Sequence, residues 1–131
     1  MNIFLWILQI VLGIYFLAVG IIHFVVPPGL PAQMAWMYDL TPTLHYLSGT
    51  AEILGGLGLI LPGIFRIQTR LVPLAALGLT LVMAGAIVYH ATRGEFQNIA
   101  LNVILLVSSA FVAYGRWKLK PLGDRRATSE A

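Results

Sequence analysis

The amino-acid sequence predicts an all-α fold: an integral membrane four-helix bundle with both termini on the cytoplasmic side. Hydrophobic residues make up 59% of the 131-residue chain and charged residues only 10%, whereas a soluble domain carries roughly 25% charged residues. Four long apolar segments are separated by proline, glycine or charged residues. Each is close to the length of about 20 residues that crosses a bilayer as a helix. Only connecting loops and a short tail remain, which excludes a separate catalytic domain.

The first span is predicted at residues 3–26. Gln9 and His23 are its clearest polar interruptions, and the sequence Pro27-Pro28-Gly29 ends the helix because proline cannot continue the helical hydrogen-bond pattern. The segment lacks the basic n-region and the A-x-A cleavage site of a secretory signal peptide, and it is long for an h-region. We therefore expect it to be retained as a membrane span.

Local signals also set the limits of the later spans. Pro62 is expected to end the second helix, Pro73 lies in the first turn of the third, where its missing N–H costs little, and Asn98 is a candidate N-cap for the fourth. These three spans are predicted at residues 44–61, 71–91 and 99–117, and they are followed by a basic cytoplasmic tail at residues 118–131.

The distribution of positive charge predicts the orientation. Arg93 alone lies between the third and fourth spans, and the first loop contains no lysine or arginine. Loops rich in Lys and Arg stay in the cytoplasm, so the N-terminus, the second loop and the C-terminus are predicted to be cytoplasmic. A basic cluster beside a span is typical of a topology signal and of lipid-headgroup contact rather than of nucleic-acid binding. This cluster follows the fourth span and consists of Arg116, Lys118, Lys120, Arg125 and Arg126. The second loop adds Arg66 and Arg70 on the same side.

The first loop, residues 27–43, is long for a connection between two helices and lies on the predicted outer side. Its aromatic residues, including Trp36 and Tyr38, are typical of anchors at the membrane interface. The alternative is that the loop acts as a lid or as a docking surface over the outer end of the bundle.

Glu52 is the most informative polar residue. It lies ~12 Å below the start of the second span, given a rise of about 1.5 Å per residue, where a charge costs about 2.5 kcal/mol or more. His45, Gly49, Glu52 and Gly56 share one helical stripe, on which glycine allows another helix or a ligand to come close. Glu52 is either a neutral acid that ties helices together, or a proton acceptor, ion ligand or substrate contact.

Polar residues from all four spans lie in the predicted outer half of the bundle, which predicts an outward-opening polar pocket around Glu52. His23 and His90 are on different helices at similar depth, an arrangement that haem or a metal ion also uses. No local ligand spacing supports such a site, so no metal site and no joint haem ligation are predicted. No catalytic residue is assigned. The predicted ligand-binding residues are Glu52, His23, His45, His90 and Asn102.

Three segments resemble the DoxX-like family of small four-span membrane proteins: Leu12 to Gly20 with His23, Gly49 to Gly56, and Met83 to His90. The resemblance extends over about residues 10–117. It implies a link to a membrane subunit of thiosulfate:quinone oxidoreduction or to oxidative-stress complexes. The family has no agreed catalytic motif from which residue roles can be transferred.

These observations favour a multi-pass protein of the bacterial inner (plasma) membrane that acts as a redox-associated subunit and binds a small hydrophobic molecule, such as a quinone, in the outer-half pocket. It would act with partner membrane subunits or as a homo-oligomer. Because the chain contains no cysteine, chemistry through a protein thiol is excluded. The alternative is a non-enzymatic membrane scaffold or assembly partner. A transporter is less suitable, because alternating access usually needs more helices and internal repeats. The sequence does not decide whether the chain catalyses a reaction.

Overall fold

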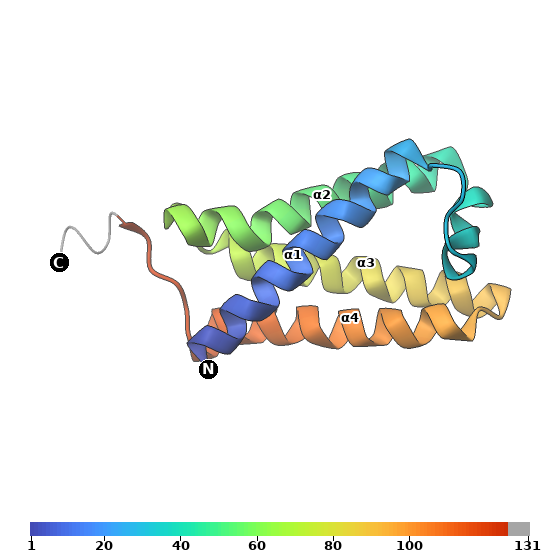
Figure 1. Ribbon diagram of the computed structural model, residues 1–131. Coiled ribbons are helices and arrows are strands. Elements are labelled where there is room, and N and C mark those ends of the chain that lie inside the picture. Colours follow the sequence, from blue (N-terminus) through green and yellow to red (C-terminus); the bar gives the residue numbers. More distant parts are fainter. Residues whose placement is uncertain (126–131) are drawn as a thin grey trace.

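The computed structural model describes residues 1–125, which form four long helices and two short helical segments (Figure 1). No strand occurs among these residues, and all four long helices are long and apolar enough to cross a membrane. The predicted all-α membrane bundle is therefore confirmed, while its orientation stays a prediction. The elements are α1 (Asn2–Val25), the 3₁₀ helix η1 (Ala32–Tyr38), α2 (Pro42–Phe65), α3 (Leu71–Arg93), α4 (Phe96–Tyr114) and the π-helical segment η2 (Gly115–Leu119).

The helices form two hairpins, with α1 packed mainly against α2 and α3 packed mainly against α4. Helices α2 and α3 join the hairpins and diverge with distance from the short turn that connects them, and η1 lies at the wide end (Figure 1). This end of the bundle, which carries η1, is called the η1 end below, and it is the predicted outer end. Apolar side chains exposed along the four helices include Ile14, Leu54, Leu81 and Ile104, as expected for surfaces that contact lipid.

Glycines bring α1 and α2 into close contact. A Cβ atom at Gly56 would lie 2.7 Å from the Gly13 carbonyl oxygen, and one at Gly20 would lie 3.0 Å from the Gly49 carbonyl oxygen. Small residues at such crossings let two helix backbones approach each other. The predicted glycine stripe on the second span is therefore the contact face for α1, and Glu52 is buried on the same face.

Two predicted helix ends are wrong. Helix α2 continues through Pro62 to Phe65, because a proline so near the end removes only one hydrogen bond, and its own carbonyl accepts from the N–H of Arg66. Helix α4 begins at Phe96, and its N-cap is Glu95 rather than Asn98. The N–H of Asn98 already donates to the Glu95 carbonyl at 3.1 Å, so Asn98 lies inside the first turn.

Arg116 does not extend toward lipid headgroups, which corrects the interpretation of this residue as part of a headgroup-contacting cluster. Its side chain is buried; Nε donates to Gln9 Oε1 at 2.5 Å and one terminal nitrogen donates to Asn2 Oδ1 at 2.6 Å. Gln9 Nε2 in turn donates to the Leu59 carbonyl at 2.9 Å. Arg116 and Gln9 therefore tie η2, α1 and α2 together at the end that carries the N-terminus. Arg126, also assigned to the cluster, lies outside the described residues.

Candidate functional site

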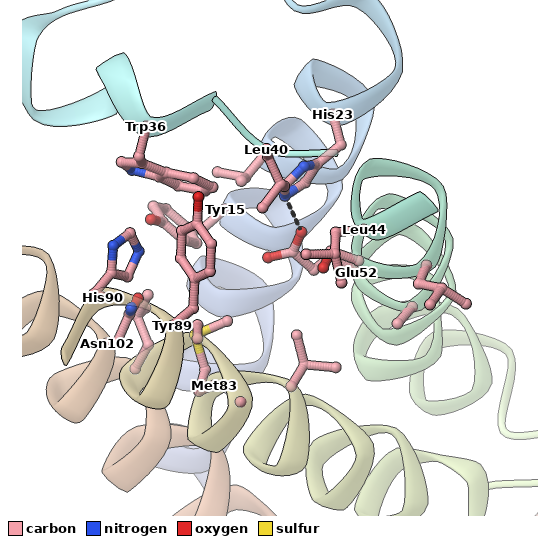
Figure 2. Close-up of a pocket in the computed structure, with 18 residues that line it drawn as sticks. Tyr15, His23, Trp36, Leu40, Leu44, Glu52, Met83, Tyr89, His90 and Asn102 are labelled. Atoms are coloured by element: carbon pink, nitrogen blue, oxygen red, sulfur yellow. Dashed lines mark ion pairs between the residues drawn. The ribbon is translucent and has the colours of Figure 1, made fainter. Parts of the chain in front are cut away.

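A cavity of about 450 Å³ lies at the η1 end between the four helices, and residues of η1 and of the loop after it also line it (Figure 2). Four of the five predicted site residues line this cavity: His23 on α1, Glu52 on α2, His90 on α3 and Asn102 on α4. The fifth, His45, contacts His23 instead of lining the cavity. The structure thus brings the predicted residues together, and their role in ligand binding stays a prediction.

The walls of the cavity are mainly apolar and aromatic. Leu44 and Leu47 come from α2, and Val82 and Met83 from α3. Aromatic rings surround the space near Glu52 and His90 (Figure 2), contributed by Tyr15, Trp36 and Tyr89. Apolar walls with a few polar side chains are typical of sites for small organic ligands.

Glu52 begins a chain of polar contacts that leads away from the cavity. Glu52 Oε2 lies 3.0 Å from His23 Nε2, and a dashed line marks this contact in Figure 2. The Nδ1 atoms of His23 and His45 are 2.9 Å apart. His45 Nε2 lies 2.8 Å from the carbonyl oxygen of Met37 in η1. All four residues are buried. A carboxyl group inside the bundle is therefore connected, through two imidazoles, to the segment over the cavity.

Local sequence explains how this chain is assembled. Thr41 caps α2 by accepting a hydrogen bond from the N–H of Leu44, and Pro42 occupies the first turn. This start places His45 in the first turn of α2, two turns before Glu52 on the same face. The close contact of Gly20 with α2 then brings His23, three residues later on α1, beside both side chains.

Two buried polar atoms of the cavity lack an aligned hydrogen-bond partner among the described residues: Glu52 Oε2 and Asn102 Nδ2. Glu52 Oε2 is close to His23, yet the contact lacks hydrogen-bond geometry and is an ion-pair distance only. Glu52 is 4% exposed and Asn102 is 8% exposed. A buried polar group without a partner costs about 1–3 kcal/mol. Both atoms are thus suited to bind the polar part of a ligand.

Comparison with known families matches residues 7–112 of this chain to the DoxX-like family. The chain belongs to the DoxX-like family. No curated protein and no solved structure matches it significantly. The matched region contains all five predicted site residues, together with η1, so the cavity lies entirely within the DoxX-like part of the chain. The resemblance seen in the sequence is confirmed.

A second polar cluster of this DoxX-like protein connects the loop after η1 to the turn between α3 and α4. Arg93 donates to Asp39 Oδ2 at 2.7 Å and to Glu95 Oε1 at 2.9 Å, and the same Glu95 oxygen lies 2.9 Å from His90 Nδ1. Burial alone would raise the pKa of Glu95, but hydrogen bonds from His90 and Arg93 outweigh it and lower this pKa. Sequence reasoning missed Asp39, Arg93 and Glu95 as a cluster, because their side chains meet only when the loop folds back over the bundle.

The histidines of the DoxX-like cavity are already engaged by protein groups. The two ring nitrogens of His23 contact His45 and Glu52, and Nδ1 of His90 contacts Glu95. The Trp36 ring contacts both, with centroids 5.9 Å from His23 and 4.9 Å from His90. Among the described residues, no group of three or more His, Cys, Asp or Glu side chains is arranged to hold a metal ion. Haem ligation by His23 would require the chain of contacts to break.

Proposed function

We propose that this DoxX-like protein binds a small hydrophobic molecule with a polar head, such as a quinone, in the cavity at the η1 end, and that it serves as a redox-associated subunit of the bacterial inner membrane. The observation that carries this proposal is the buried Asn102 Nδ2, which has no hydrogen-bond partner among the described residues, together with the buried Glu52 carboxyl, whose Oε2 makes no aligned hydrogen bond there, in a cavity with mainly apolar walls. Unpartnered polar groups are rare in folded proteins, and intramembrane acids are functional candidates.

The groups that line the cavity fit a quinone head. Its two carbonyl oxygens accept hydrogen bonds, and Asn102 Nδ2 can donate one of these bonds. Glu52 can donate the other when it carries a proton, and Tyr15, Trp36 and Tyr89 supply aromatic surfaces for a planar ring. The cavity volume of about 450 Å³ lies within the usual range for ligand sites. A bound quinone would supply two-electron redox chemistry, while the chain binds and orients the head.

Access to the cavity is lateral in this proposal. Gly85 on α3 lines the cavity and is exposed, and a Cβ atom there would meet no neighbouring atom within 4 Å among the described residues. Leu44 and Leu47 on α2 also line the cavity and are exposed. The cavity therefore reaches the surface between α2 and α3, where a membrane protein contacts lipid tails. A lipophilic ligand would enter from the bilayer at this place.

Mass spectrometry of lipophilic molecules that co-purify with the protein in mild detergent tests the proposal. We expect one class of lipophile at near-stoichiometric occupancy in the wild-type protein, and loss of most of it in Asn102→Leu, which removes the amide but retains the branching at Cγ. Ser109→Ala is the matched control, because Ser109 Oγ on α4 is also buried without a hydrogen-bond partner in the described part of the chain but does not line the cavity. An empty wild-type cavity together with a stably bound partner protein would instead favour the scaffold function.

A further inference from the structure

The three polar contacts that link Glu52, His23, His45 and the Met37 carbonyl fix how many hydrogens this series of contacts must contain. The Met37 carbonyl can only accept a hydrogen bond, so His45 Nε2 must carry a hydrogen. The two facing Nδ1 atoms, 2.9 Å apart, need one hydrogen between them. His23 Nε2 and Glu52 Oε2 lie 3.0 Å apart without aligned hydrogen-bond geometry. A third hydrogen is still needed between them, because otherwise the lone pairs of two acceptor atoms would face each other. Two neutral imidazoles supply two hydrogens, so the observed geometry requires one additional proton.

This additional proton makes the chain electrically neutral. It can be carried by the Glu52 carboxyl, by the His23 ring or by the His45 ring, and in each case the summed charge of the three side chains is zero. Neutrality suits their position, because an uncompensated charge inside a membrane protein is costly. The other titratable groups that line the cavity are Tyr15 on α1 and Tyr89 and His90 on α3; α4 contributes the uncharged Asn102. His90 is held by Glu95, which Arg93 also contacts.

Removal of this proton would break the series of polar contacts from Glu52 to Met37. The carboxylate charge would remain buried without a counter-charge, and one of the three contacts would lose its hydrogen. If His23 kept its hydrogen toward Glu52, the lone pairs of the two Nδ1 atoms would face each other at 2.9 Å, which is repulsive. His45 would then have to rotate, and its hydrogen bond to Met37 would be lost.

Met37 belongs to η1, so its contact with His45 helps to hold η1 over the cavity. Trp36, the residue before it, lines the cavity with Leu40 just after η1 (Figure 2). Two polar side-chain contacts hold this segment to the helices, His45 to the Met37 carbonyl at 2.8 Å and Arg93 to Asp39 at 2.7 Å. The Trp36 ring adds contacts with the rings of His23, Tyr89 and His90. The first of the two polar contacts depends on the proton count of the chain, whereas the second joins two groups of opposite charge.

We propose that Glu52, His23 and His45 form a one-proton site that keeps η1 closed over the cavity while the proton is bound and releases it when the proton leaves. The proton does not have to reach the protein surface. It only has to leave these three side chains, for example by transfer to a molecule in the cavity. The idea that this opening controls access of a ligand rests on the proposed function. The opening of η1 itself does not require a ligand.

The experiment measures η1 opening directly in the ligand-free detergent-solubilised protein, through a cysteine introduced as Met37→Cys. The native chain has no cysteine, and Met37 is fully buried, so alkylation reports exposure of this position. Ala35→Cys, at an exposed position of the same helix, corrects for the pH dependence of the thiol itself. The quantity compared is the ratio of the two alkylation rates. Leu40→Cys provides a second reporter in case Met37→Cys alters packing.

In the otherwise wild-type protein, we expect this ratio to rise at least about tenfold from the acid end to the alkaline end of a pH series, because loss of the proton opens the contacts. In Glu52→Gln the ratio should stay low throughout, because the amide always donates to His23 Nε2 and never titrates. In His45→Ala it should stay high. A flat ratio in the wild-type background would overturn the proposal. So would a pH response that survives in Glu52→Gln, since His90 and Glu95 would then be its source. Failure to find a bound lipophile would overturn the proposed function but not this one.

Discussion

Glu52 Oε2 on α2 lies 3.0 Å from His23 Nε2 on α1, and both side chains are buried. Neither residue could be placed there as an isolated charge, because removal of one charged group from water costs several kcal/mol. The charge of the Glu52–His23–His45 group is balanced, and each of its contacts contains a hydrogen, only if these three side chains together hold one additional proton. The relationship therefore connects helix packing, protonation and the coverage of the cavity.

Substitution of Glu52 should separate its structural role from its protonation. We expect Glu52→Gln to retain nearly the wild-type thermal stability in detergent, because glutamine has almost the same volume and can donate to His23. Glu52→Leu should lower the free energy of unfolding by about 1–3 kcal/mol, because it leaves His23 Nε2 buried without a partner. Equal stability of the two variants would show that the contact contributes nothing to the fold.

Gly85 should control entry of the ligand. Gly85→Leu is expected to lower the occupancy of the co-purifying lipophile severalfold without loss of thermal stability, because Gly85 lines the cavity and a Cβ atom there meets no described residue within 4 Å. Gly78→Leu is the matched control: Gly78 lies seven residues earlier on the same helix, also with open space at its Cβ position, but it does not line the cavity. Equal occupancy in both variants would exclude entry beside Gly85.

Arg116 should stabilise the opposite end of the bundle. Arg116→Leu leaves Gln9 Oε1 and Asn2 Oδ1 without their donor, and we expect a loss of about 1–3 kcal/mol in the free energy of unfolding. Lys118→Leu, at an exposed position of the same η2 segment, should change it by less than about 0.5 kcal/mol. Thermal unfolding in one detergent measures both. A cost as large for Lys118→Leu would indicate a general effect of charge removal.

The orientation of the bundle can be tested with the same cysteine-free background. Single cysteines at Ala35 and Thr92, both exposed at the η1 end, should react with a membrane-impermeant thiol reagent applied to intact cells. A cysteine at Gln68, exposed in the turn between α2 and α3, should react only after lysis. The reverse pattern would place both termini outside, contrary to the positive-inside rule.

Much of the fold could be predicted because the signals for it are local. Each span is a property of its own residues: length, hydropathy and flanking prolines predicted four helices, and the stripe from His45 to Gly56 predicted which face of α2 is buried. The grouping of Glu52, His23, His90 and Asn102 around one pocket was predicted from their shared position in the outer half of the bundle. Local signals gave the wrong helix end at Pro62 and the wrong cap at Asn98. Whether a helix continues through a proline, and which residue caps it, depends on the neighbouring backbone groups.

The sequence by itself determined that four apolar helices form, that their polar groups gather at one end, and that glycines mark a contact face. Only the tertiary structure decided that His45 contacts His23 and Met37 rather than the cavity, that Arg93 holds Asp39, and that Arg116 is buried against Gln9. The physical reason is that contacts between helices depend on how each helix is rotated and crossed against its neighbour. Between α1 and α2, that geometry is set by the close approach of the two backbones at Gly13, Gly20, Gly49 and Gly56. The periodicity of residues along a single helix does not specify how it crosses another helix.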